Sequence, residues 1–130
     1  MSMRRKLLLA LCACLLCFVL LLTARPSYRP FSELSEDTIS AIELDIGLGI
    51  IDRVEDPAVL DAFAEQLSAL KISRYADAEG TALATLWIMR EDVGEFELVL
   101  FPAHVVIDGV SCEADPAVIE ALVNLAQRAS

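Results

Sequence analysis

An uncharged apolar run near the N-terminus constrains this chain most. Leu7 to Ala24 contains eighteen residues without a charge or a proline, and Arg4, Arg5 and Lys6 precede it. As a helix, this run would span about 27 Å at 1.5 Å per residue, close to the roughly 30 Å hydrocarbon core of a bilayer. We therefore expect a membrane-spanning helix over residues 7–24. Its anchoring side chains would include Leu7, Leu11, Leu16, Phe18 and Leu22.

Three processing routes fit this segment. The preceding basic residues favour an uncleaved signal anchor, because positive charge is retained in the cytoplasm. A cleaved secretory signal is the second route, although the run exceeds the usual 7–15 residues and Leu22 stands where cleavage requires a small residue. The third route is a lipoprotein, because Leu11-Cys12-Ala13-Cys14 resembles a degenerate bacterial lipobox with Cys14 as the lipidation site.

The signal-anchor interpretation divides the chain into four parts. They are a cytoplasmic N-terminus over 1–6, a transmembrane helix over 7–24, a linker over 25–37 and an extracytoplasmic domain over 38–130. Arg25 and Arg29 follow the apolar run, but the basic triplet before it outnumbers them. We therefore expect a single-pass protein of the cell membrane, with its N-terminus inside and its C-terminal domain outside the cytoplasm.

Charge is distributed unevenly along the chain. Residues 26–130 carry 20 acidic against 6 basic groups, a net charge of −14. Nucleic-acid binding requires a basic face that releases counterions from phosphates, so we expect no nucleic-acid partner. The same charge argues against a domain that lies on an anionic bilayer.

A period of two in the apolar residues predicts the first strand. From Ile42 to Ile50 every even position is Ile or Leu, while Glu43 and Asp45 occupy odd positions. This alternation is typical of a half-buried strand. Gly47 and Gly49 permit a turn, so the run either forms one strand or folds as a hairpin that continues to about Val54.

Two amphipathic helices are predicted by their starts. Asp56-Pro57 and Asp115-Pro116 each supply an N-cap followed by proline at the first helical position, and apolar residues at helical spacing follow both. The eight residues from Asp56 match the eight from Asp115 in character. Either the domain is a tandem of two strand-strand-helix units, or both helices use the same favourable start.

Asp108-Gly109 between apolar runs predicts a β-hairpin over Val105–Cys112, because a type I′ turn requires positive φ at both central positions. A two-residue loop pairs Ile107 with Val110, and this register places Val105 opposite Cys112. His104 would then point to the other face, beside Glu113.

The remaining strands complete the expected fold. We predict them over Lys71–Tyr75, Ala82–Met89 and Phe96–Leu100. Ala82–Met89 is apolar on both faces and holds Trp87, so we expect it in the middle of a covered sheet. The fold class is therefore α+β: a mostly antiparallel sheet of five to six strands, with two helices packed on one face.

No residue pattern predicts a catalytic, cofactor or metal site. The hairpin register separates His104 from Cys112, which argues against a thiol-imidazole dyad. One histidine and one cysteine after residue 24 do not make a zinc site, and no calcium loop or phosphate loop occurs. Acids gather in three clusters, which we interpret as solvated turns and helix caps. The clusters are Glu33, Glu36 and Asp37; Asp52, Glu55 and Asp56; and Glu91, Asp92 and Glu95.

The order of basic N-terminus, single span, short tether and acidic α+β domain resembles small single-pass surface proteins of Gram-positive bacteria. The resemblance covers architecture alone and transfers no functional residue. The predicted anchor and the lack of catalytic residue sets favour a membrane-anchored extracytoplasmic module. We expect its exposed sheet face or sheet edge to bind a protein or envelope ligand, in addition to the contact of residues 7–24 with the lipid bilayer. The alternatives are a small carboxylate-dependent hydrolase, whose acids converge from separate turns, and a lipoprotein-type accessory protein.

Overall fold

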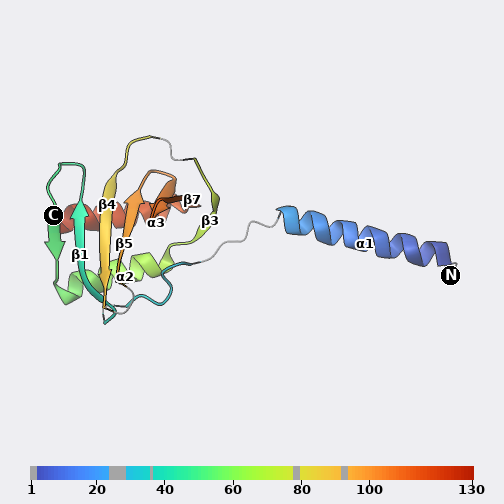
Figure 1. The fold of residues 1–130 in the computed structure, drawn as a ribbon, viewed down its shortest axis with the longest axis horizontal. Coiled ribbons are helices and arrows are strands. Elements are labelled where there is room, and N and C mark those ends of the chain that lie inside the picture. Colours follow the sequence, from blue (N-terminus) through green and yellow to red (C-terminus); the bar gives the residue numbers. More distant parts are fainter. Residues whose placement is uncertain (1–2, 24–28, 36, 78–79, 92–93) are drawn as a thin grey trace.

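The computed structural model describes residues 3–23, 29–35, 37–77, 80–91 and 94–130. In these ranges it shows an α+β fold with one antiparallel sheet of seven strands in the order β2-β1-β4-β5-β6-β7-β3 (Figure 1). The elements in chain order are α1 (Met3–Thr23), β1 (Ile39–Asp45), β2 (Asp52–Val54), α2 (Pro57–Ala69), β3 (Ile72–Tyr75), β4 (Ala84–Arg90), β5 (Gly94–Leu100), β6 (His104–Ile107), β7 (Val110–Ala114) and α3 (Pro116–Ala129).

The structure contradicts the membrane span that was predicted for the N-terminal helix α1. Within the described part of the chain, no helix combines the length and the apolar composition that crossing a bilayer requires. The membrane, signal-anchor and single-pass assignments are therefore overturned.

The residues predicted to anchor the chain are exposed where they are described. Leu7, Leu11, Leu16 and Phe18 are exposed on α1, whereas the side chain of Leu22 lies outside the described residues. Cys14 is an exposed free cysteine. The location of the C-terminal domain outside the cytoplasm was inferred from the span and stays an untested prediction.

The predicted hairpin at Asp108-Gly109 forms, and of the two alternatives for the run from Ile42 the hairpin is the one observed. The sheet therefore has seven strands, where five to six were expected. β1 pairs with β2 from Ile42 opposite Val54 to Leu44 opposite Asp52. The chain turns between them at Gly47 and Gly49, whose φ angles of 94° and 74° suit glycine. This loop exposes three large apolar side chains, Leu48, Ile50 and Ile51.

The β6–β7 hairpin confirms the predicted turn and register. Asp108 and Gly109 have φ angles of 47° and 87°, so both central positions are left-handed, as a type I′ turn requires. Ile107 pairs with Val110, Val105 with Cys112 and His104 with Glu113. The turn and the register therefore both agree with the prediction from the local sequence.

The two C-terminal helices start as predicted. The Asp56 side chain accepts a hydrogen bond from the Ala58 amide, and the Asp115 side chain accepts one from the Ala117 amide. Proline follows each cap at the first helical position, where its missing N–H costs nothing. The caps have nearly the same backbone angles, with φ near −62° and ψ near 120° at Asp56. This likeness concerns the helix starts alone and leaves both explanations of the repeated sequence open.

α2 and α3 cover one face of the sheet, behind the strands in Figure 1. The core between the helices and the sheet contains Phe63 and Leu67 of α2 and Leu122 of α3, which pack over fully buried side chains from alternate positions of β1, β4 and β5. Phe31 and Leu34, from the segment interpreted as a linker, also enter this core. The ring of Phe31 stacks on Phe96 with centroids 4.8 Å apart.

The outer strands of the sheet are short or irregular. β2, at one edge, contains three residues. β3, at the other edge, pairs with β7 through Ile72 and Tyr75, and the register shifts between these two pairs.

Candidate functional site

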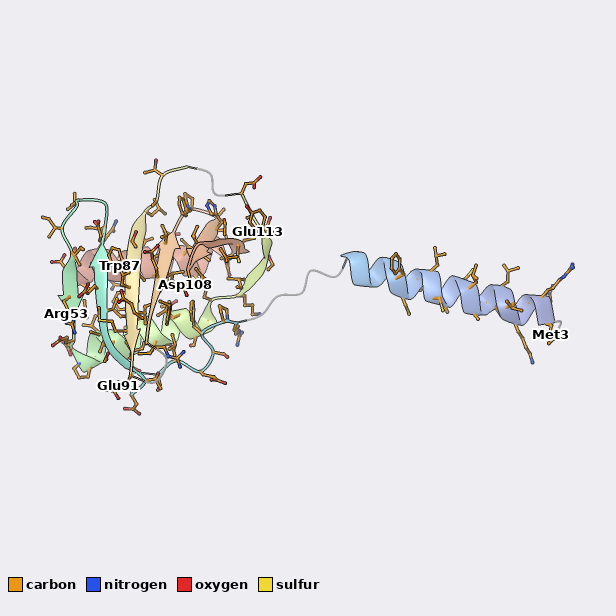
Figure 2. The ribbon with its side chains drawn as sticks, in the orientation of Figure 1. Met3, Arg53, Trp87, Glu91, Asp108 and Glu113 are labelled. Atoms are coloured by element: carbon orange, nitrogen blue, oxygen red, sulfur yellow. The ribbon has the colours of Figure 1, made fainter. Side chains whose placement is uncertain are left out.

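The sheet has a second face, which neither α2 nor α3 covers, and we call it the open face. The alternation of side chains along each strand shows which residues belong to the open face. Leu86 and Ile88 are fully buried under the helices, so their neighbours in β4 point to the open face. Figure 2 looks onto this side, with Trp87 labelled near its middle. The open face includes Ala41, Glu43, Asp45, Arg53, Thr85, Trp87, Met89, Glu95, Glu97, Val99, His104, Val106, Ser111 and Glu113.

Trp87 lies at the centre of a row of paired residues that crosses the open face. Glu43 of β1 is its partner on one side, and Glu97 of β5 is its partner on the other. Its indole Nε1 donates a hydrogen bond to Glu97 Oε2 at 3.1 Å, which fixes the orientation of the half-buried ring. The sequence predicted that β4 lies in the middle of the sheet, and β4 is an inner strand, between β1 and β5.

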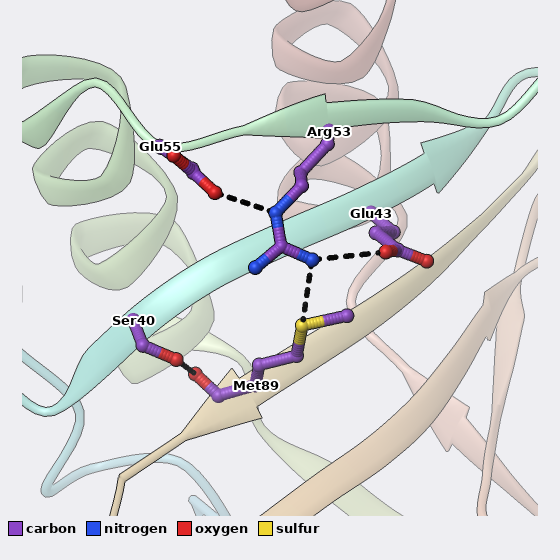
Figure 3. A network of polar contacts seen from close by, with 5 residues as sticks. All are labelled: Ser40, Glu43, Arg53, Glu55 and Met89. Carbon is purple, nitrogen blue, oxygen red and sulfur yellow. Dashed lines mark hydrogen bonds and ion pairs between the residues drawn. The ribbon is translucent and has the colours of Figure 1, made fainter.

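Arg53 extends this row to the edge strand and forms two ion pairs (Figure 3). Its Nη1 donates to Glu43 Oε1 at 3.1 Å, and its Nε donates to Glu55 Oε1. Nη1 also lies 3.6 Å from the sulfur of Met89. The hydrogen bond to Glu55 and then the one to Glu43 raise the pKa of Arg53 above its ordinary value. A cation is thus held on the open face by carboxylates and a polarisable side chain.

The type I′ turn between β6 and β7 is hydrogen-bonded to β5 beside this row. The Glu97 amide donates to Asp108 Oδ1 at 2.9 Å, and the Asp108 amide donates to the Glu97 carbonyl at 3.0 Å. Asp108 therefore has two roles: it adopts the left-handed conformation of the turn and it accepts a hydrogen bond from the neighbouring strand. The carboxylates of Glu97 and Asp108 are both held at this point of the open face.

His104 occupies a buried corner of the same face. Its ring stacks on Phe101 with centroids 4.3 Å apart, and the residue is 7% exposed. We expected His104 beside Glu113 on this face, and the two residues do lie opposite each other, but His104 is buried beneath Phe101. Two buried polar atoms in this corner, His104 Nε2 and Ser111 Oγ, have no hydrogen-bond partner in the described structure.

Cys112 lies on the helix-covered side, against the core, as the register predicts. His104 and Cys112 therefore point to opposite faces of the sheet, which excludes a thiol-imidazole dyad.

A groove of about 370 Å³ lies near the start of α2 and brings together one acid from each predicted acidic cluster. Asp37, Glu55 and Glu91 line it. Glu55 is held by Arg53, and in the described residues no group of three or more His, Cys, Asp or Glu side chains is placed to hold a metal ion. The groove is wide and polar, and the structure gives these acids no shared hydrogen bond.

Compared with family models, curated proteins and solved structures, the chain shows no significant similarity to any of them. Its function must therefore be argued from its own surface.

Proposed function

We propose that the folded domain is a protein-binding module that binds its partner on the open face. The observation that supports this function is the uncovered side of the sheet, where apolar side chains lie half-buried among carboxylates. The apolar side chains are those of Trp87, Met89, Val99 and Val106.

The physical argument concerns the cost of ordering side chains on binding. Side chains on paired strands are already restricted in their rotamers, and the Trp87 ring is further held by Glu97. Binding a partner over these side chains therefore costs less side-chain entropy than binding one over a mobile loop. Tryptophan and methionine are also enriched at the centres of protein interfaces, where an apolar body and polar surroundings are both needed. This binding role does not depend on a membrane anchor.

Selection of peptides from a displayed random library against the full chain tests this function. The test variant is Val99→Gln/Val106→Gln, which removes two apolar side chains from the open face without changing charge. The matched control is Ala58→Gln/Ala117→Gln, which introduces two glutamines at exposed positions of α2 and α3.

We expect selected peptides to bind the wild type and the control equally, and to bind the open-face variant at least tenfold more weakly. Circular dichroism checks that all three proteins fold. Peptides that bind both double variants alike, or a library that yields no specific binder, would contradict the proposed function.

A further inference from the structure

The charge of the open face is unbalanced. Its strands and the β6–β7 turn present six carboxylates, while Arg53 is the one basic residue among its described side chains. The acids are Glu43, Asp45, Glu95, Glu97, Asp108 and Glu113. Like charges on neighbouring strands repel one another in the free protein. Binding of a positively charged partner would relieve this repulsion.

Arg53 shows how a cation fits this surface. Its guanidinium binds Glu43 and Glu55 and touches Met89, a combination of carboxylates with a polarisable apolar side chain. This arrangement places one positive charge among the acids of the β1–β2 side of the face. The β5 side has no comparable cation among the described residues, although Glu95, Glu97 and Asp108 are exposed there.

Trp87 separates the two sides. Its ring is half-buried, and its Nε1 hydrogen bond to Glu97 places a carboxylate at the edge of the ring. Indole is the aromatic side chain that binds cations best, and an adjacent carboxylate adds Coulombic attraction. A guanidinium is planar, so it stacks on the ring while donating to a carboxylate at its edge.

We propose that the open face binds a cationic segment of a partner protein, with an arginine side chain stacked on Trp87 beside Glu97. This inference rests on the proposed function and names the chemistry of the partner. Half-buried Val99 and Val106 continue the surface beyond the tryptophan, so apolar residues next to the arginine fit as well.

The full chain allows a site-specific test, because Trp87 is its one tryptophan and its fluorescence reports on this position alone. The probe is the capped peptide Gly-Arg-Val-Arg-Gly, and its matched control contains citrulline, which has nearly the shape of arginine but no charge. We expect the arginine peptide to change the Trp87 fluorescence saturably at low salt, with about tenfold tighter binding than the citrulline peptide. Binding should weaken when salt is raised, because the charges are exposed.

Two variants test the role of the carboxylate beside the ring. Glu97→Gln keeps an acceptor for the indole N–H but removes the charge, so we expect about threefold weaker binding of the arginine peptide. Glu120→Gln makes the same change on the exposed side of α3 and should leave binding unchanged. Equal weakening by both variants would show a general charge effect and overturn the site at Trp87.

The outcomes separate this inference from the proposed function. If both peptides bind equally well, the face binds peptides and the cation site is wrong. If neither changes the fluorescence, the cation site is also wrong, and the library selection decides the binding function independently. Residues 1–25 of this chain are basic, so sedimentation of the full chain is the last check. Self-association that Glu97→Gln abolishes would replace the separate partner with a second copy.

Discussion

The two faces of the sheet differ in what their side chains do, and adjacent residues of one strand show it. Leu98 and Leu100 of β5 are fully buried beneath the helices, whereas Glu97 and Val99, which alternate with them, lie on the open face. The first pair removes apolar surface from water, which is the main favourable term in folding. The second pair remains accessible to a partner. Under the proposed function, the covered side of the sheet provides stability and the open side provides recognition.

The difference has a consequence for substitution. Changes on the covered face should act on the free energy of unfolding, and changes on the open face should act on binding. The variants below test that separation, from the largest expected effect to the smallest, and each uses the full chain with urea unfolding as the measurement.

Leu98→Ala should cause the largest loss of stability. It removes a fully buried side chain, so we expect a loss of about 2–5 kcal/mol from the transfer term and the cavity. Val99→Ala, one residue further along the strand on the open face, should cost about 1 kcal/mol or less, because its side chain is half-buried. Similar losses for the two variants would show that the open face is also part of the folding core.

Gly109→Ala should destabilise the protein by about 1–2 kcal/mol. A Cβ there would meet no atom within 4 Å, so the cost comes from the left-handed backbone at φ 87° alone. Asp108→Asn is the control, because asparagine tolerates the left-handed region and keeps an acceptor for the Glu97 amide. If Gly109→Ala unfolds at the same urea concentration as the wild type, the type I′ turn does not form in solution.

Asp56→Ala and Asp115→Ala should each cost about 1 kcal/mol, because each removes the acceptor for a helix amide. The caps belong to separate helices, so the double variant should lose roughly the sum of the two. Asp61→Ala, at an exposed position within α2, is the control for loss of a carboxylate and should change stability little. A double variant no less stable than either single variant would contradict this additivity.

Ser111→Ala should have the smallest effect and the opposite sign. The Ser111 hydroxyl is buried without a hydrogen-bond partner, so its removal should stabilise the fold by about 0.5–1 kcal/mol. Ser111→Thr keeps the hydroxyl and provides the comparison. Clear destabilisation by Ser111→Ala would mean that the hydroxyl is satisfied in solution.

Local chemistry explains which parts of the fold could be predicted. The Asp108-Gly109 turn and both Asp-Pro helix starts depend on residues within a few positions of one another, and all three form as expected. The alternation in β1 likewise predicted a strand with Glu43 away from the core.

The candidate site was not predictable in the same way. β4 has apolar residues at both alternate sets of positions, so the sequence could not show that Trp87 faces the uncovered side. That outcome depends on both helices packing against the same face. Trp87 pairs with two acids, Glu43 and Glu97, and this arrangement indicates a polar face. It can be recognised only once the pairing of β1, β4 and β5 is known. The burial of His104 was missed because Phe101 folds back over it.

The two edge strands affect whether the sheet can aggregate at high protein concentration. A free strand edge is a template on which another copy can add its own backbone, and such growth leads to fibrils. Here β2 offers only three residues, and the uneven pairing of β3 interrupts the ladder at the opposite border. Neither border supports a long run of new backbone hydrogen bonds, so the sheet is expected to resist fibril growth even though its broad side is open to a partner.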